Sequence, residues 1–196
     1  LLSPMFASAQ VGQILWEDDF DNFDTNIWTK DQGDGCPELC GWGNQELQYY
    51  QDENVYIEEI PGEPGNYALV LEARNESAGN QSFTSGKVTT QNKLAVKYGM
   101  IEFRIKVPDD LSKGLWPAAW LLGTNHSSDG WPFCGEIDMM EMGHSTTFRN
   151  EQEFPSAKHP LKPTHLAQLA LTAMPHAEVE EGLVLSAKNF LSDGLS

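Results

Sequence analysis

Basic side chains are scarce in this chain of 196 residues. Lys and Arg together number 12 against 29 Asp and Glu, which gives a formal net charge of -17 at pH 7. Such a charge repels polyanions at low ionic strength, so it argues against a nucleic acid partner and mildly against a sulfated polymer. Long apolar runs are also missing, since no stretch approaches the roughly 18 residues of a membrane-spanning helix. We therefore expect no nucleic acid and no membrane among its partners.

Cysteine is limited to three positions. Cys36 and Cys40 are separated by three residues, a spacing at which a disulfide is sterically feasible in an exported protein. Cys134 is left over, and its place beside an apolar segment is typical of a small buried side chain. Because the three cysteines lack the histidine spacing of a metal site, we expect no metal and no cofactor.

The N-terminal segment ends in Ala7-Ser8-Ala9, which is the small-residue pattern of a signal peptide cleavage site. We interpret residues 1–9 as the remnant of a signal peptide. The sequence therefore predicts a secreted, extracellular protein, and we expect it to be a monomer.

Three carboxylates lie within residues 136–141, at Glu136, Asp138 and Glu141. In a β-strand the side chains alternate between faces, so Glu136 and Asp138 share one face while Ile137 points to the other, toward a core. Glu141 is out of phase by one residue. It returns to the carboxylate face only if a β-bulge absorbs one residue, most simply at 139–140.

Two reactive carboxyl groups on one surface are the requirement of retaining glycosidases, which hold them roughly 5 to 5.5 Å apart. Like charges held close together favour retention of a proton by one member of the group. Five residues of extended strand span about 16 Å, so a bend at the bulge and the reach of the side chains must close that distance. The alternative is that these are solvated acids on the polar face of an amphipathic strand.

Short alternating runs dominate the first 144 residues. Ile101, Phe103, Ile105 and Val107 share one face of a predicted strand, and Glu102, Arg104 and Lys106 share the other. Residues 69–74 show a second strand, and Pro-Gly and Asp-Gly pairs mark turns between such runs. This pattern predicts an all-β fold, an antiparallel sandwich.

The composition changes at residue 145. The segment 145–196 contains no Trp, Tyr or Cys, and prolines at 155, 160 and 163 disfavour a central strand. Residues 165–171 and 178–191 resemble helices by their spacing of apolar side chains. We therefore expect a divergent tail of helix and loop, and an incomplete sandwich with exposed strand edges.

Five stretches together resemble glycoside hydrolase family 16, in particular its laminarinase-like endo-β-1,3-glucanases. They are residues 42–50, 84–90, 98–106, 114–120 and 131–141, and they match in the order of the family. The resemblance implies a jelly-roll sandwich of the concanavalin A type, with a substrate site on its concave face. It covers about residues 11–144, so we interpret 10–144 as the N-terminal part of a family 16 catalytic domain.

The same resemblance implies roles for the three acids. Glu136 is the nucleophile, Glu141 the general acid/base, and Asp138 a helper bonded to the nucleophile. The E-x-D-x-x-E spacing is similar to that of the laminarinase, agarase and carrageenase branches.

Four further positions resemble sugar contacts of the family. Trp116 and Trp131 resemble walls of the substrate site, although core packing is the alternative for each. Asn44 resembles a residue that bonds sugar hydroxyls on the non-reducing side, and a simple turn residue is its alternative. Arg74 resembles a sugar-binding arginine, with a salt bridge at the strand edge as its alternative. Glu17 lies near a structural calcium site of the family, but its usual partner from the last strand is missing.

The predicted function is therefore retaining hydrolysis of internal β-1,3 links in laminarin-type β-glucans, with a neutral polysaccharide as partner. One alternative is a lectin-like, non-catalytic β-glucan-binding protein. Another is a family member made inactive by truncation.

Overall fold

The computed structural model describes residues 13–107, 115–141, 167–175, 181–186 and 190–191. Its strands are β1 (Ile14–Trp16), β2 (Thr29–Lys30), β3 (Gln48–Tyr50), β4 (Val55–Glu59), β5 (Tyr67–Ala73), β6 (Phe83–Ser85), β7 (Lys87–Thr89), β8 (Met100–Ile101), β9 (Arg104–Lys106), β10 (Leu115–Gly123), β11 (Glu136–Glu141), β12 (Ala167–Pro175), β13 (Glu181–Ser186) and β14 (Phe190–Leu191). The short helices of the described part are η1 (Cys40–Gly43), η2 (Asp52–Asn54) and α1 (His126–Asp129). The signal peptide predicted at residues 1–9 lies outside the described residues.

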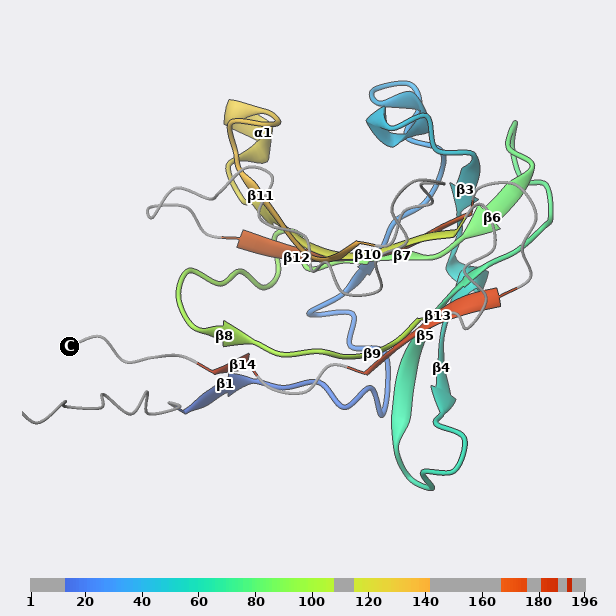
Figure 1. Cartoon of the computed structure of the whole chain (residues 1–196). Coiled ribbons are helices and arrows are strands. Elements are labelled where there is room, and N and C mark those ends of the chain that lie inside the picture. Colours follow the sequence, from blue (N-terminus) through green and yellow to red (C-terminus); the bar gives the residue numbers. More distant parts are fainter. Residues whose placement is uncertain (1–12, 108–114, 142–166, 176–180, 187–189, 192–196) are drawn as a thin grey trace, which may run out of the picture.

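The strands form two layers (Figure 1). One layer is a five-stranded sheet in the order β11-β10-β12-β7-β2. The facing layer contains a four-stranded sheet, β4-β5-β13-β9, and a three-stranded sheet, β1-β14-β8. Their pairings are antiparallel, whereas the separate pair of β3 and β6 is parallel. The expectation of an all-β antiparallel sandwich is confirmed.

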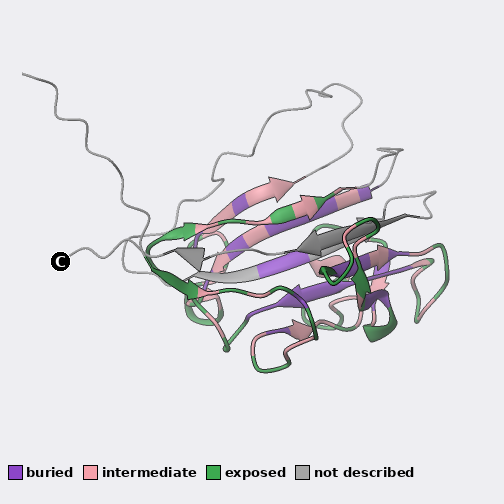
Figure 2. Ribbon diagram, turned by 90° about the horizontal axis from the view of Figure 1, so that it is seen from below, coloured by how far each residue is buried: buried purple, intermediate pink, exposed green. Residues whose placement is uncertain are grey.

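The core fills the space between the layers. The five-stranded sheet contributes Val88, Ala119, Leu121 and Leu171, and β4 and β5 contribute Val55, Leu69 and Leu71. Figure 2 shows buried residues along these strands and exposed residues in the loops between them. We call the side of the five-stranded sheet that contacts this cluster its inner face, and the opposite side its outer face.

One end of the core depends on a buried tryptophan. Trp28 and Phe20 are both 0% exposed. The Trp28 indole N–H donates to Asp18 Oδ2 at 2.8 Å, and the Phe20 amide donates to Asp18 Oδ1 at 2.9 Å. Burial raises the pKa of Asp18, although these two hydrogen bonds oppose the rise. Asp18 thus supplies the acceptor that lets a bulky indole enter an apolar core.

The strand predicted at residues 101–107 has the expected alternation. Its apolar residues Ile101, Phe103, Ile105 and Val107 pack against the core, and its charged residues are exposed. The structure divides this run into β8 and β9, which pair with β14 and β13 respectively.

The helices predicted in the C-terminal tail are wrong. Residues 167–175, 181–186 and 190–191 are strands, and β12 lies between β10 and β7 while β13 lies between β5 and β9. Ala170 and Leu171 are buried at 3% and 0% exposure. β12 is defined by its pairing with β10 and β7, which are distant in sequence, and the spacing of apolar residues within one short segment did not separate strand from helix. The prolines at 155, 160 and 163 lie outside the described residues.

Candidate active site

The site begins with an irregularity in the pairing of β11 with β10. Glu136 pairs with Leu122 and Asp138 with Trp120, but Met140 pairs with Ala119 and Glu141 with Ala118. One residue of β11, Met139, therefore has no partner position on β10, which defines a β-bulge. The bulge predicted at residues 139–140 is confirmed.

The bulge sorts the side chains of β11. Ile137, Met139 and Met140 pack against the core cluster on the inner face. Glu136, Asp138 and Glu141 pair with Leu122, Trp120 and Ala118, which occupy alternate positions along β10. Since alternate positions of a strand share a face, the three carboxylates all belong to the outer face.

Two indole groups hold two of these acids. Trp116 Nε1 donates to Glu141 Oε1 at 3.1 Å, and Trp131 Nε1 donates to Glu136 Oε2 at 3.1 Å. Asp138, between them in the sequence, is only 5% exposed. The structure thus brings Trp116 and Trp131 together with the predicted catalytic acids.

The two tryptophans differ in their surroundings. Trp116 is partly buried and packs in an outer-face cluster with Tyr50, Ala118 and Trp120. Trp131 is 57% exposed in the loop after α1, and nearby Phe133 is 71% exposed. An exposed fraction of 57% does not fit core packing, so that alternative is wrong for Trp131. α1 and the segment that carries η1, blue in Figure 1, both rise above the outer side of the sheet.

A second group of polar residues, which the sequence patterns did not single out, continues the outer face on β7 and β3. Lys87 Nζ lies 4.0 Å from the ring centroid of Trp42 and 5.9 Å from that of Trp120. It also pairs with Asp31 Oδ2 at 3.1 Å, and its side chain is only 11% exposed. A buried lysine that meets aromatic rings and one carboxylate is a fixed positive charge. The available signal was Lys87 itself, a charged residue directly before the core residue Val88.

Asn44 lies directly after η1 and is exposed. Its Nδ2 donates to Glu46 Oε1 at 3.1 Å. The position fits the turn alternative, and it leaves the predicted sugar contact as a prediction.

Arg74, like Asn44, has its contacts away from the carboxylates of β11. Its guanidinium donates to Glu72 Oε2 at 2.6 Å and to the Glu53 carbonyl at 2.8 Å, and it lies 3.7 Å from Glu76 Oε1. These contacts raise the pKa of Arg74, with the Glu72 hydrogen bond as the largest cause. The salt-bridge alternative is confirmed, and none of these partners belongs to the carboxylate group of β11.

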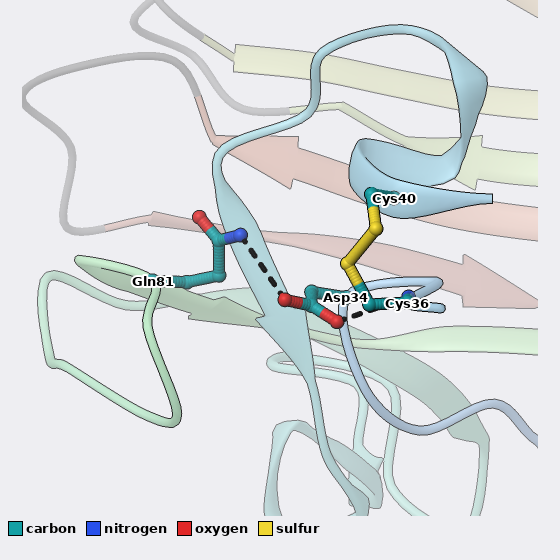
Figure 3. Close-up of a disulfide and its surroundings, with 4 residues drawn as sticks. All are labelled: Asp34, Cys36, Cys40 and Gln81. Carbon is teal, nitrogen blue, oxygen red and sulfur yellow. Dashed lines mark hydrogen bonds between the residues drawn. A yellow bond between two sulfur atoms is a disulfide. The ribbon is translucent and has the colours of Figure 1, made fainter. Parts of the chain in front are cut away.

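A disulfide closes the loop that precedes η1 (Figure 3). Cys36 and Cys40 are bonded, with their Cα atoms 4.2 Å apart. Asp34 accepts hydrogen bonds from the Cys36 amide at 3.1 Å and from Gln81 Nε2 at 3.4 Å. The structure thus contains the bridge that the spacing allowed, and Cys134 is buried as a thiol.

The resemblance also raised a structural calcium ion near Glu17. Within the described residues, no three His, Cys, Asp or Glu side chains are grouped so that they would hold a metal ion. The calcium site near Glu17 stays a prediction, and no chemistry below passes through a metal. In the same part of the chain, no helix has the length and apolar character needed to cross a membrane.

Comparisons with known proteins identify the family of the chain. The family model described as "Beta-glucan synthesis-associated protein SKN1/KRE6/Sbg1" matches residues 7–135. The glucan endo-1,3-beta-glucosidase A1 of Niallia circulans is 33% identical over 148 residues, which cover 65% of this chain and 20% of that protein. The beta-glucanase of Rhodothermus marinus is 36% identical over 134 residues, which cover 66% of this chain and 43% of that protein. The chain thus spans less than half the length of either relative.

Among solved structures, the laminarinase catalytic domain of Thermotoga maritima is similar with a TM-score of 0.76 at 28% identity. The alignment covers 95% of this chain and 100% of that domain, so it includes part of the tail beyond residue 144. The chain therefore belongs to the SKN1/KRE6/Sbg1 family of beta-glucan synthesis-associated proteins, and its sandwich is that of the laminarinases of glycoside hydrolase family 16.

Proposed function

We propose that this chain hydrolyses internal β-1,3 links of laminarin-type β-glucans with retention of anomeric configuration. One observation carries the proposal: the bulge at Met139 turns Glu136, Asp138 and Glu141 to one face, where two of them accept indole hydrogen bonds. Solvated acids on an ordinary polar strand need neither the bulge nor the tryptophans. The relative from Niallia circulans is named a glucan endo-1,3-beta-glucosidase and that from Rhodothermus marinus a beta-glucanase, and these names support the choice of substrate.

In the first step, Glu136 attacks the anomeric carbon while Glu141 gives its proton to the departing glycosidic oxygen. The C–O bond to the leaving sugar breaks, and a glycosyl ester of Glu136 forms. The Trp131 indole donates to one oxygen of Glu136, which stabilises and orients the ionised nucleophile. The Trp116 indole orients Glu141 in the same way.

In the second step, Glu141 takes a proton from a water molecule that attacks the same carbon. The ester bond to Glu136 breaks, the sugar is released with its original configuration, and both carboxyl groups return to their starting states. Asp138 is 5% exposed and lies between them in the sequence, and we assign it the role of positioning the nucleophile. No cofactor takes part in these steps.

The outer face also suits a neutral sugar chain. Its aromatic residues offer broad apolar rings to the C–H faces of pyranoses, while indole N–H groups and amides suit hydroxyls. A formal charge of -17 disfavours polyanionic polysaccharides.

The direct test is release of reducing sugar from laminarin, compared with the Glu136→Gln variant. We expect release by the unaltered chain and none by the variant, with equal thermal midpoints. When an oligosaccharide with a blocked reducing end is cleaved, NMR at early times should show the new reducing ends in the β configuration. Release by both proteins, or initial α products, would contradict the proposal.

The second candidate is β-glucan binding without hydrolysis. It is favoured by the family's description, which concerns synthesis of β-glucan and not its breakdown. If the protein binds to an insoluble β-1,3-glucan and releases no sugar from it, this second candidate is selected. If the chain neither binds this glucan nor releases sugar from it, it is an inactive member of the family.

We further propose that the chain acts outside the cell as a monomer. The Cys36–Cys40 disulfide supports an oxidising compartment, because such bonds are rare in the cytosol. Secretion of a tagged full-length precursor and sedimentation of the purified chain would test the two parts of this proposal.

A further inference from the structure

A partly buried carboxylate, Glu46, connects the exposed Asn44 to the interior. Glu46 Oε1 accepts from Asn44 Nδ2 at 3.1 Å. Glu46 Oε2 accepts from Gln48 Nε2 at 2.6 Å and from the Tyr50 hydroxyl at 3.1 Å. We call these four residues the Glu46 network.

The inner end of the network is rigidly held. Gln48 and Tyr50 are 0% exposed, and Tyr50 contacts the Trp42 ring at a centroid distance of 5.5 Å. Burial raises the pKa of Glu46, while hydrogen bonds and the positive charge of Lys87 act in the opposite direction. A carboxylate with three donors and a nearby fixed cation keeps one orientation, because every alternative leaves a buried donor without an acceptor.

The outer end of the network, Asn44, is less constrained by its surroundings. Asn44 is exposed, and its backbone lies between the short helix η1 and β3. An exposed amide on such a loop samples several rotamers unless something fixes it. The hydrogen bond to Glu46 is the contact that transmits the rigidity of the buried end to this side chain.

We propose that Glu46 is a positioning residue that orients the Asn44 amide toward a hydroxyl of the bound β-glucan. This inference rests on the proposed function, since it takes the sugar contact of Asn44 as its object. Fixing a rotamer before binding removes an entropic cost that otherwise falls on the complex, which corresponds to about 2- to 12-fold in affinity. Glu46 touches no reacting atom, so its effect belongs to binding and not to bond cleavage.

The identity of the group matters more than its size. Glutamine at position 46 has one acceptor oxygen where glutamate has two. If that oxygen serves Gln48 and Tyr50, the new NH₂ group faces the NH₂ group of Asn44, and the contact is lost or the Asn44 amide inverts. Glu46→Gln therefore disrupts the orientation of Asn44 with almost no change of volume.

The kinetic test is a double-mutant cycle on laminarihexaose. We expect Glu46→Gln to raise KM by about 2- to 12-fold with kcat unchanged. In the Asn44→Ala background the same substitution should change KM by less than about 2-fold, because its target is gone. An equal rise in both backgrounds, or a fall in kcat, would overturn the inference and assign Glu46 a general structural role.

A second readout needs no activity. In the ligand-free chain, ¹⁵N relaxation of the Asn44 side-chain amide should show an ordered group that becomes mobile in Glu46→Gln. The Gln32 amide, which donates to Asp52 at 3.0 Å on the surface, serves as the internal control and should not change. Thermal midpoints establish that each variant folds. If Glu46→Gln does not fold, Asn44→Asp tests the same hydrogen bond from the exposed side, because it places two carboxylates next to each other.

The two measurements separate the possible failures. An ordered, Glu46-dependent Asn44 amide in a chain that neither cleaves nor binds laminarihexaose supports the positioning role and overturns the proposed function. Cleavage of laminarihexaose by a chain whose Asn44 amide is equally mobile with and without Glu46 overturns the positioning role and leaves the proposed function intact.

Discussion

The two faces of the five-stranded sheet are made by the same strands and have opposite properties. Along β10, Ala119 and Leu121 belong to the inner core, whereas Trp116 and Trp120 pack on the outer face. The inner face is apolar, and the outer face combines indoles, carboxylates and a buried lysine. The difference shows how a step of one residue separates the groups that stabilise the fold from those assigned to chemistry.

The bulge on β11 is where this separation is enforced. At Met139 and Met140 two successive residues contact the inner core, and the outer face regains a carboxylate at Glu141. A regular strand would have directed Glu141 inward, where an unpaired charge is costly. Substitutions on the inner face should therefore lower the free energy of unfolding, whereas substitutions on the outer face should lower activity.

The largest expected effect is on the outer face, for Glu141→Gln. Loss of the proton donor should lower turnover of laminarin by about 10²- to 10⁴-fold, because general acid catalysis contributes that much. An aryl glycoside with a good leaving group should keep its first step, since its departure needs no proton. Initial rates on both substrates check this, with the thermal midpoint as control. Equal loss on both substrates would contradict the acid role.

On the inner face, Leu171→Ala should unfold the chain more easily without a specific effect on chemistry. Leu171 is 0% exposed and pairs with Ala119 and Val88, so its truncation leaves a cavity that costs about 2 to 5 kcal/mol. Urea denaturation measures the change, and Leu15→Ala, at a side chain 65% exposed, is the matched control. If Leu171→Ala lowers the free energy of unfolding by no more than Leu15→Ala does, the placement of β12 in the core is contradicted.

Asp18→Ala tests the polar support of the same core. The substitution leaves the indole N–H of fully buried Trp28 without its acceptor, which should lower the free energy of unfolding by about 1 to 3 kcal/mol. Near-ultraviolet circular dichroism should report a changed environment of Trp28. Hydrolysis per folded molecule should stay the same. A loss of activity without a loss of stability would contradict the assignment of Asp18 to the core alone.

Trp116→Phe is the milder test of the outer face. It removes the indole donor to Glu141 but keeps an aromatic ring, so kcat/KM on laminarin should fall by about 5- to 10-fold. The free energy of unfolding should change by less than about 0.5 kcal/mol because the ring still packs. A destabilisation as large as that of Leu171→Ala would show that Trp116 is a core residue, its alternative interpretation.

The smallest expected effect concerns pH. Burial raises the pKa of Glu46 above its ordinary value of 4.5, so the folded chain binds this proton more tightly than the unfolded chain. Ionisation of Glu46 therefore opposes folding, and its contribution to stability improves as pH falls from 7 through the raised pKa. Relative to Glu46→Gln, the unaltered chain should gain less than about 1 kcal/mol over that range. Urea titrations at pH 7 and pH 5 measure the free energy of unfolding of both proteins. If the unaltered chain loses stability relative to Glu46→Gln at pH 5, the expected direction is contradicted.

Local patterns predicted the parts of this fold that depend on alternation alone. The strand at residues 101–107, the bulge near Met139 and the common face of three carboxylates all follow from the period of two, which one segment carries by itself. The spacing of Cys36 and Cys40 allowed the disulfide that the structure contains. These predictions needed no knowledge of distant neighbours.

The tail and the role of Lys87 required the tertiary structure. β12 and β13 are strands because β10, β7, β5 and β9, all distant in sequence, flank them and saturate their backbone groups, which overrides local helix propensity. Lys87 acquires its role from the rings of Trp42 and Trp120, which lie far from it in the sequence. The hydrogen-bond partners of Glu46 and the ion-pair partners of Arg74 lie within four residues of them, but no sequence pattern marked those partners. The sequence by itself determined which side chains share a face, because that is a property of one extended backbone. Only the packed sheets decided which strands are neighbours, because pairing is a choice among partners that are far apart along the chain.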